Sequence, residues 1–449
     1  MLIDTDILFR QDSKFHYLFG VKEPDFFAAI ETDTKKSILF IPKYGCVDSF
    51  IYRLPADFAV WMGPILPPSY YKDLYKVDEV LFTDDIPAYF KEFAPEVVYV
   101  TKGQNSDSGN WAQPAHFDGI ENYNVDEEYL FKAITECRVF KTAKEMEVYR
   151  YVAKVGSQAH LDNMAALNPE MYESQIESVF RHSNYFKGGC RLCSFIPICA
   201  SGRNSSILHY GHAGAPNDRL MHDGEWLLMD MGSEYHCYAC DITTTCPVNG
   251  KFTPEQKFIY ETVLEMNRQC QLMMKPGVNW RDVHKMSNRV ATQRFIEQGL
   301  FKGDLEEMME RNLFGYFMPH GLGHFMGIDV HDVGGFTEGM ERDTIMGYKS
   351  LRTKRDLQEG MLITVEPGVY FVDCCIEKIK ADPELNKFVN WEVIEKDYYP
   401  IGGCRIECDV YITKDGSEDI TCAPRTVEDI EAVYRGDITS VDQIKSFLL

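Results

Sequence analysis

The sequence predicts a two-domain protein that mixes α-helices with β-strands, in the α/β (α+β) class. The chain has 449 residues, more than one hydrophobic core ordinarily serves, so two domains are expected. The first part alternates short apolar runs with helical patterns, whereas the second part combines capped helices with apolar runs that carry acids. A polar stretch at 119–136 separates the two parts, and the domain ranges that we predict are 1–125 and 138–449.

Strands are indicated by short apolar runs that turn-forming or charged residues bound, which is typical of α/β units. In the first domain these runs are 26–30, 37–41 and 96–100. In the second domain they are 226–230, 361–366 and 405–410. The later runs carry the acids described below.

The second domain should begin with a long helix. Thr142 and Glu145 form a capping box, in which each side chain bonds the other residue's backbone N–H group, and an amphipathic pattern follows to about residue 167. A second box at 253–256, with proline at the first helical position, predicts a helix to about residue 274. A further helix is expected over 280–298.

Composition excludes some classes of function. The net charge of -23 argues against nucleic acid as a partner, because binding to phosphates requires a basic face. The first residues do not form a secretory signal, and no apolar run reaches the ~20 residues of a membrane span. We therefore expect a cytoplasmic protein without a membrane partner, in which the 14 cysteines are mostly reduced thiols.

Two aspartates lie on neighbouring apolar segments. Asp230 ends the run 226–230, and Asp241 follows Gly232–Tyr235, which we interpret as the turn of a β-hairpin that brings the two carboxylates together. Thr243 would share the strand face of Asp241 and could donate a hydrogen bond to a ligand carboxylate. The alternative is a pair of solvated turn residues, but both aspartates lie in apolar segments, where an unpaired carboxylate is costly to bury.

Three histidines gather within a short segment. His320 and His324 flank glycines in the run 319–324, and His331 follows seven residues after His324. The glycines would let backbone or substrate approach closely. A single histidine is usually a structural hydrogen-bonding residue, whereas three so close together favour a functional site.

Two glutamates complete the set of acids. Glu366 ends an apolar run, and Glu407 lies inside another, where it could instead pair with Arg405. Four carboxylates crowded around one imidazole would force one another to protonate, and two divalent cations would cancel their charge. An oxygen-rich ligand set favours Mn, Co or Fe over a structural zinc ion.

Two Cys-x-x-Cys motifs, at 190–193 and 237–240, compete with this interpretation because they suggest a zinc site. The second motif lies within the predicted hairpin, where residues three apart face opposite sides of a strand and cannot chelate together. Coincidence is the better interpretation. By the same alternation, the cysteines of the run 404–408 should point away from Glu407.

With these residues assembled, the sequence resembles the prolidase group of the pita-bread metallopeptidase family. The resemblance covers nearly the whole chain, and the spacing and order of the four acids and the histidine agree with it. The segments that carry it are Leu8–Ser13, Glu136–Thr142, Leu208–Asn217, Asp230–Gly232, Asp241–Thr243, Pro319–His324, Glu366–Gly368 and Pro424–Glu428. It implies a creatinase-like N-terminal domain, a pita-bread catalytic domain, and hydrolysis of Xaa-Pro dipeptides through a metal-bridging hydroxide.

The resemblance also implies how metal would be bound. Asp241 and Glu407 would bridge two divalent metal ions, with Asp230 on one ion and His324 and Glu366 on the other. Mn²⁺ would be the usual metal, with Co²⁺ or Zn²⁺ as alternatives. The chain would form a homodimer.

Roles in catalysis and in substrate binding follow from the same resemblance. Glu366 would move the proton, and His320 and His331 would steady the carbonyl and the developing charge. The free carboxylate of a dipeptide requires a cation, and arginine offers a bidentate fork. The residues that would bind the substrate are His209, His331 and Arg352. The residues that would support the metal ligands are Thr243 and Arg405.

Some positions depart from the family pattern. Phe195 stands where a tyrosine is common, and Cys408 follows Glu407 where an acid is usual. The family pattern places the start of the chain inside the first domain. Trp61 resembles a loop residue that reaches the partner subunit's site, or it is an ordinary core or surface tryptophan.

Two other functions compete with dipeptide hydrolysis. An Xaa-Pro aminopeptidase, of the aminopeptidase P kind, would share every metal ligand but accept longer peptides. The presence of His209 and the likeness around Arg352 favour the dipeptidase. A non-catalytic binding protein on the same fold would be expected to have lost metal ligands, whereas all five are present.

Overall fold

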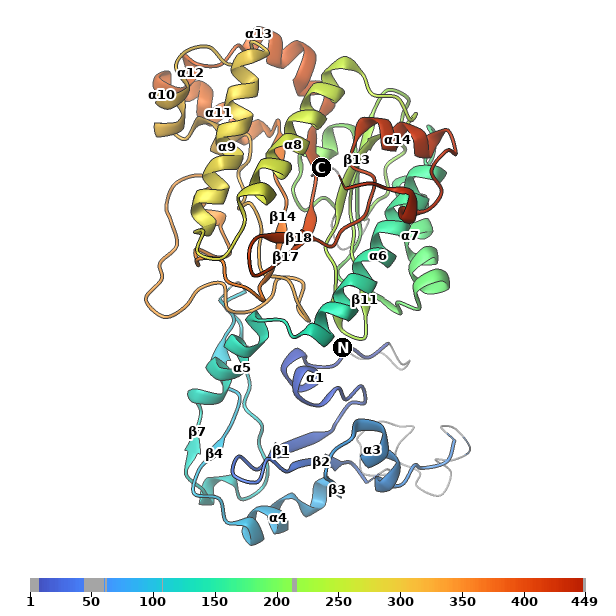
Figure 1. The fold of residues 1–449 in the computed structure, drawn as a ribbon, viewed down its shortest axis with the longest axis vertical. Coiled ribbons are helices and arrows are strands. Elements are labelled where there is room, and N and C mark those ends of the chain that lie inside the picture. The colour runs from blue at the N-terminus through green and yellow to red at the C-terminus, as the bar shows by residue number, and fades with distance from the viewer. Residues whose placement is uncertain (1–7, 44–59, 61–62, 107, 212–215, 447–449) are drawn as a thin grey trace. The chain divides into compact units, whose positions relative to one another are not determined.

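The computed structural model describes residues 8–43, 60, 63–106, 108–211 and 216–446 (Figure 1). The chain divides into two compact units, 1–137 and 138–449. Trp61 lies outside the described residues. Within the ranges given above, no helix has the length and apolar character that a membrane crossing requires.

A three-stranded sheet organises the first unit. Strand β1 (Phe27–Ile30) pairs antiparallel with β2 (Ser37–Ile41), which pairs parallel with β3 (Glu79–Phe82). The predicted strand at 37–41 is confirmed, and the one at 26–30 begins one residue later. The third is shorter than predicted, because only β4 (Val98–Tyr99) pairs, with β7 (Val125–Asp126).

Side-chain alternation along β2 explains how this sheet is covered on both faces. Leu39 and Ile41 pack in a cluster with residues of α1 (Ser13–Phe19) and α3 (Pro68–Tyr75). Ile38 and Phe40 pack instead with residues of α4 (Ile86–Phe93). Such two-sided burial explains why β2 reads as a continuous apolar run. The unit's other elements are η2 (Thr83–Asp85), β5 (Gly103–Gln104), β6 (Trp111–Ala112), η3 (Ile120–Asn122) and α5 (Tyr129–Val139), which ends two residues past the boundary.

Four long helices frame the second unit, and they pack in two pairs (Figure 1). Helix α6 (Ala143–Ala166) lies against α7 (Glu173–Gly188), and α8 (Pro254–Met273) lies against α9 (Trp280–Glu297). Both predicted capping boxes are confirmed at the starts of α6 and α8, and the predicted ends of three helices agree to within one residue. The shorter helices are α10 (Leu305–Glu310), α11 (Asp373–Ala381), α12 (Pro383–Asn386), α13 (Trp391–Val393) and α14 (Val427–Tyr434).

In the described part of the second unit, four small antiparallel sheets lie between these helices. In the first, β10 (Trp226–Asp230) is central between β9 (Ile198–Ser201) and β13 (Thr243–Pro247). In another, β17 (Cys408–Ile412) is central between β14 (Leu362–Val365) and β18 (Ser417–Asp419). The remaining sheets are β8 (Leu192–Cys193), β11 (Ser233–Tyr235) and β12 (Tyr238–Ala239), and the pair β15 (Gly368–Tyr370) and β16 (Gly403–Arg405).

The predicted turn at Gly232–Tyr235 was wrong. Most of that segment forms strand β11, which pairs with β12, and the chain turns at His236 and Cys237, both of which have positive φ. Two consecutive residues with positive φ match the twist of a tight hairpin. The carboxylates still approach, because β10 pairs with β13 in a register that places Asp230 opposite Thr243.

The predicted strand at 405–410 is interrupted. Strand β16 pairs with β15, whereas β17 pairs with β14, so the chain leaves one sheet and enters another at Ile406 and Glu407. The backbone N–H of Glu407 donates to the carbonyl of Thr243 at 3.1 Å instead of extending either ladder. A carboxylate therefore stands where two sheets meet.

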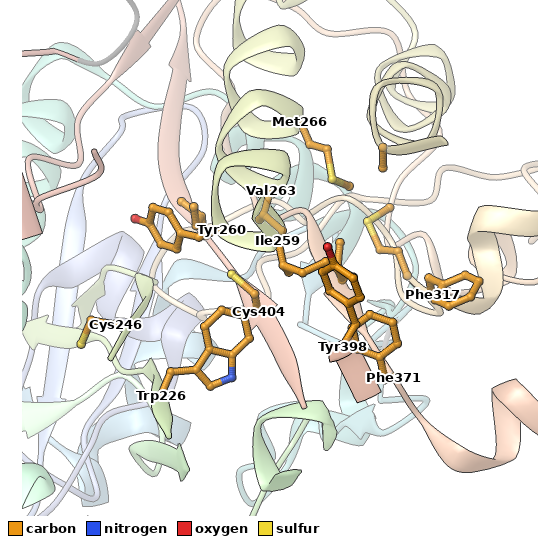
Figure 2. Packing of buried hydrophobic residues seen from close by; sticks show 14 of the residues in the cluster. Trp226, Cys246, Ile259, Tyr260, Val263, Met266, Phe317, Phe371, Tyr398 and Cys404 are labelled. Carbon is orange, nitrogen blue, oxygen red and sulfur yellow. The ribbon is translucent and has the colours of Figure 1, made fainter. Parts of the chain in front are cut away.

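The largest apolar cluster lies around α8 and spreads to the surrounding strands. Figure 2 shows Ile259 of α8 pointing at the rings of Phe371 and Tyr398, while Trp226 of β10 lies near Cys404 of β16. These side chains are buried. Each Å² of apolar surface that is buried contributes about 25 cal/mol to the free energy of folding. The packing of such large groups therefore fixes the strands that carry the acids described next.

Candidate active site

One cavity of about 290 Å³ in the second unit is lined by ten of the residues singled out from the sequence. They are His209, Asp230, Asp241, His320, His324, His331, Arg352, Glu366, Arg405 and Glu407. Thr243 lies behind the cavity, bonded to Glu407. Phe195 is half-buried and is not part of the lining.

Four acids form one side of the cavity, which we name the acid wall: Asp230, Asp241, Glu366 and Glu407. Three sets of side chains have ligand atoms within 4.8 Å of one another. The sets are Asp230, Asp241 and Glu407; His324, Glu366 and Glu407; and Asp241, His324 and His331. Because the sets share members, the arrangement can accommodate two neighbouring cations.

Strand pairing brings these four acids close together. Asp230 ends β10, and Asp241 lies two residues before β13, the strand that pairs with β10. Glu366 follows β14, and its backbone N–H donates to the carbonyl of Leu322 at 2.8 Å. Glu407 stands between β16 and β17. Each acid therefore lies at or beside a strand end, held by bonds that do not use its carboxylate.

The electrostatics of the acid wall favour the binding of cations. Burial and the nearby charges of Asp241 and Glu366 raise the pKa of Asp230 to about 7, although Arg405 opposes the shift. Burial and the neighbouring acids also raise the pKa of Glu366 and that of Glu407. Among the described residues, the buried Oδ1 atom of Asp230 has no hydrogen-bond partner. An acceptor left without a partner, among acids that repel one another, fits a metal ligand.

His324 points its Nε2 atom toward the acids. Its Nδ1 lies 2.9 Å from the carbonyl oxygen of Phe325, which can only accept, so Nδ1 carries the proton. The Nε2 atom lies 3.4 Å from Asp241 Oδ2 and 3.7 Å from Glu366 Oε1, and although burial opposes it, these carboxylates raise the pKa of the ring. A backbone acceptor that fixes the tautomer in this way is typical of metal-binding histidines.

The segment around His324 extends a sheet. The backbone of Thr364 donates to the carbonyl of His324, and the backbone of Met326 donates to that of Leu362, so the segment runs along the edge of β14. Gly323 is required there, because a Cβ atom would stand 2.0 Å from the carbonyl oxygen of Thr364. The glycines predicted to allow a close approach therefore do so.

Arg405 connects the acid wall to its surroundings. Its guanidinium donates to Asp230 Oδ2 at 2.5 Å, to Thr243 Oγ1 at 3.0 Å and to the Tyr370 hydroxyl at 2.9 Å. Thr243 Oγ1 donates in turn to Glu407 Oε2 at 2.7 Å. The arginine thus pairs with Asp230 and reaches Glu407 through Thr243, rather than pairing with Glu407 directly as the sequence also allowed.

His320 is neutral and already has two partners. Its Nδ1 donates to the carbonyl of Gly321 at 2.7 Å, and the Tyr370 hydroxyl donates to its Nε2 at 3.0 Å. Burial and the nearby charge of Arg405 lower its pKa to about 3. Its Nδ1 also lies 3.8 Å from Glu366 Oε2. The ring therefore stands beside the acid wall as a hydrogen-bonding group rather than as a cation.

His331 stands beside His324 in a loop that a buried ion cluster anchors. The two rings have centroids 4.4 Å apart, and burial and His324 lower the pKa of His331 to about 2. The next residue, Asp332, accepts from Arg138 at 2.6 Å and from Lys141 at 2.8 Å. Burial would raise the pKa of Asp332, but these two cations lower it. The charged cluster therefore holds the neutral histidine in place.

The same cavity is lined by a second set of residues, which we name the loop wall: His209, His320, His331 and Arg352. Each belongs to a segment outside the paired strands. The Arg352 segment is packed against Gly335, where a Cβ atom would stand 2.0 Å from the Arg352 carbonyl oxygen. Desolvation and the charges of Arg405 and Arg352 lower the pKa of His209. The loop wall therefore offers one guanidinium and neutral imidazoles.

Sequence reasoning missed three residues that shape the site. Tyr370 joins Arg405 to His320; it lies in β15, and Pro367 separates that strand from Glu366, so strand alternation does not relate the two residues. Asp409 accepts from the backbone N–H of Asp241 at 3.2 Å, and period-two alternation relates it to Glu407. Arg425 donates to the carbonyls of Thr243 and Glu407 across 182 and 18 residues of sequence; no local pattern indicates this contact.

Comparison with known protein families gives two matches. Residues 147–414 match the family described as Metallopeptidase family M24. Residues 1–99 match the family described as Aminopeptidase P, N-terminal domain. The first match covers more than half of the chain and includes all of the cavity-lining residues.

Curated relatives carry peptidase names. The chain is 48% identical over 433 residues to the Xaa-Pro dipeptidase of Homo sapiens, covering 96% of this chain and 86% of that protein. It is 47% identical, with the same coverage, to the Xaa-Pro dipeptidase of Mus musculus. A protein of Talaromyces marneffei named Probable Xaa-Pro aminopeptidase pepP is 37% identical, covering 96% of this chain and 89% of that protein.

Solved structures share the fold over nearly the whole chain. The aminopeptidase PepP of Pseudomonas aeruginosa superposes with a TM-score of 0.76 at 30% identity, covering 97% of this chain and 91% of that chain. A zinc-substituted aminopeptidase P of Escherichia coli, in complex with product, superposes with a TM-score of 0.75 at 29% identity and the same coverage. Both the N-terminal and the catalytic architecture predicted from the sequence are thereby confirmed.

Proposed function

The chain belongs to metallopeptidase family M24, and we propose that it is an Xaa-Pro dipeptidase, which hydrolyses the bond before the proline of a dipeptide. The observation that carries this proposal is one cavity that the acid wall shares with His209 and Arg352. Its volume of about 290 Å³ is near the lower end for ligand pockets and suits a small peptide. The names of the mammalian relatives support the same activity.

We further propose that Asp230, Asp241, His324, Glu366 and Glu407 hold two divalent cations, with Mn²⁺ favoured over Co²⁺ or Zn²⁺ because the donors are mainly carboxylates. The overlapping sets of ligand atoms and the Asp230 oxygen without a partner support this assignment. Two cations bound there would neutralise the acid wall and supply a nucleophilic water at neutral pH.

The chain's own residues would divide the remaining chemistry. Glu366 reaches from His324 Nε2 at 3.7 Å to His320 Nδ1 at 3.8 Å, so its carboxylate can pass a proton from the metal side to the leaving amine. Neutral His331 can donate a hydrogen bond to the scissile carbonyl oxygen. His320 has weaker support as a catalytic residue, because Gly321 and Tyr370 already occupy both of its ring nitrogens.

His209 and Arg352 account for a preference for dipeptides. A dipeptide ends one residue after the scissile bond, so its carboxylate lies close to the metal site and needs a nearby cation. Arg352 can bind a carboxylate with two parallel hydrogen bonds, and His209 can add a third. In a longer peptide the same position carries a neutral amide, which gains less from a guanidinium.

The following assignments belong to the same proposal. The domain ranges are 1–125 and 138–449, the protein is a homodimer, and it acts in the cytoplasm. The ranges rest on the polar stretch at 119–136, and the compartment rests on the composition of the sequence. The homodimer rests on the family resemblance.

The rival activity is that of an Xaa-Pro aminopeptidase, which the names of the fungal relative and the solved structures favour. The test compares kcat/KM for glycyl-proline with kcat/KM for a tripeptide that begins with the same two residues. We expect glycyl-proline to be favoured by at least about tenfold, the value of one well-placed charged hydrogen bond. Equal or better cleavage of the tripeptide would assign the chain to the rival activity.

A further inference from the structure

A fully buried carboxylate outside the cavity has no part in the chemistry proposed above. Glu173 is the first residue of α7, has no exposed surface and does not line the cavity. Burial raises its pKa. A buried carboxylate is costly unless hydrogen bonds compensate it, and this one has four. Those bonds show which segments the carboxylate holds together.

Three residues supply the four bonds. Glu173 Oε1 accepts from the backbone N–H and the hydroxyl of Ser201 at 2.8 and 2.6 Å. Glu173 Oε2 accepts from the Tyr210 hydroxyl at 2.9 Å and from the backbone N–H of Arg219 at 3.3 Å. The carboxylate thus joins helix α7 to the end of strand β9 and to both sides of the segment that carries His209.

The bond to Tyr210 bears directly on His209, its neighbour in the chain. Leu208 and Tyr210, on either side of His209, both pack against the buried cluster that includes Ile198 and Leu228. Leu208 and His209 line the cavity, whereas Tyr210 turns to Glu173. The backbone that presents His209 is therefore fixed from both sides, once by packing and once by a charge-assisted hydrogen bond.

A second glutamate holds the far side of the same segment. Glu177 lies four residues after Glu173, on the same face of α7, and accepts from Asn217 Nδ2 at 2.7 Å. The same Asn217 amide donates to the carbonyl of Pro197 at 2.8 Å, and its oxygen accepts from the backbone of Cys199. Two carboxylates on one helix thus anchor Tyr210 and Asn217.

We propose that Tyr210 and Glu173 are positioning residues for substrate binding. They attach the chain at Tyr210 to α7 and so keep His209 at the cavity, where it can bind the free carboxylate of a dipeptide. The inference rests on the proposed function. The new element is that the preference for a free carboxylate depends on the Tyr210 hydroxyl, which does not line the cavity.

The first variant is Tyr210→Phe, which keeps the ring and its packing and removes only the hydroxyl. We expect KM for glycyl-proline to rise by about tenfold, the effect of losing the hydrogen bond from His209 to the substrate carboxylate, while kcat changes by less than about twofold. For glycyl-prolinamide, which has no carboxylate, kcat/KM should be the same in the variant and the wild type.

Two further variants separate positioning from general damage. His209→Ala should show the same pattern. The double variant with Tyr210→Phe should have the same KM for glycyl-proline as His209→Ala alone, because both changes remove the same interaction, that of His209 with the substrate carboxylate. Glu173→Gln should raise KM for glycyl-proline with little change in kcat. The matched control is Tyr172→Phe, an exposed tyrosine just before α7, which should leave both substrates unaffected.

The outcomes distinguish this inference from the proposed function. If the wild type does not cleave glycyl-proline, the proposed function fails. If the wild type cleaves it but Tyr210→Phe leaves KM unchanged, or lowers kcat/KM for the dipeptide and the amide alike, the positioning role fails and the proposed function stands. An additive double variant would also overturn the positioning role.

Discussion

Asp230, Glu366 and Glu407 of the acid wall lie in or beside paired strands, whereas His209, His331 and Arg352 of the loop wall lie in segments without strand pairing. The acids are positioned by backbone ladders and by buried polar partners such as Arg405 and Thr243. The loop residues are positioned by side-chain anchors some distance away, such as the ion cluster at Asp332.

This difference predicts that substitutions in the acid wall and substitutions beneath the loop wall should affect different properties of the protein. A sheet holds its backbone whether or not one carboxylate is present, so changes in the acid wall should remove chemistry and leave the fold. A loop that depends on a few side chains should shift when one anchor is lost. Changes beneath the loop wall should therefore alter stability and substrate binding together.

The largest effect is expected in the acid wall. The change Asp241→Asn keeps the shape of the side chain but removes a charge that two of the candidate ligand sets share. We expect kcat to fall by about 10³-fold or more and the bound metal to be lost, as measured by elemental analysis. The unfolding temperature of the metal-free protein should not fall, because the change removes repulsion among buried acids.

Asp415→Asn, at an exposed position in the turn after β17, is the matched control and should keep both metal and activity. Retention of normal metal content by Asp241→Asn would show that the acid wall is not the metal site.

The next effect tests an anchor of the loop wall. Arg138→Met removes one of the two cations that pair with Asp332 and leaves a buried carboxylate short of a partner. Breaking a buried ion pair in this way costs about 3–5 kcal/mol in the free energy of unfolding, which urea denaturation of the protein would measure. KM for glycyl-proline should also rise, because His331 lies in the loop that would be displaced.

Lys144→Met is the control for this change, because Lys144 pairs with Glu147 at an exposed position on α6. It should leave both unfolding and KM almost unchanged. Equal behaviour of the two variants would mean that the Asp332 cluster does not anchor the loop.

A smaller, pH-dependent effect is expected beneath the Arg352 segment. His284 on α9 is fully buried, its ring centroid lies 4.5 Å from that of Tyr348, and burial and Arg281 lower its pKa from 6.5 to about 3. As pH falls below 6.5, His284 binds a proton in the unfolded state but stays neutral in the folded state, so the free energy of unfolding decreases. The loss at pH 5 is about 2 kcal/mol relative to pH 7.

His284→Gln removes this titration. Urea denaturation of the wild type and the variant at pH 7 and pH 5 should show the wild type losing about 2 kcal/mol more between the two values. Identical pH dependence in the two proteins would mean that His284 does not stay neutral in the folded state.

The same contrast explains what the sequence could predict. Strand alternation suggested that Thr243 could bond a candidate ligand carboxylate, which it does at Glu407, and the predicted capping box at Thr142 and Glu145 is present. Local patterns are sufficient for such features because their physical causes lie within a few residues. The turn at His236 and Cys237 was missed because neither residue type marks positive φ as glycine does.

Long-range contacts could not be predicted in this way. The split of the run 405–410 depends on which strands it meets, and nothing in the run itself specifies its partners. The contacts of Arg138 with Asp332 and of Arg425 with Thr243 join residues more than 180 positions apart. His320 and His331 of the loop wall were found because histidines cluster there, whereas His209 and Arg352 were found through family resemblance, because loops carry no periodic signal.

The proposed activity depends most on whether two cations occupy the acid wall. The direct measurement removes all metal with a chelator, confirms its absence by elemental analysis, and follows cleavage of glycyl-proline while Mn²⁺ is added back. We predict no turnover in the metal-free protein and recovery that is complete at two bound ions per chain. Full turnover by protein that contains no metal would contradict the central claim.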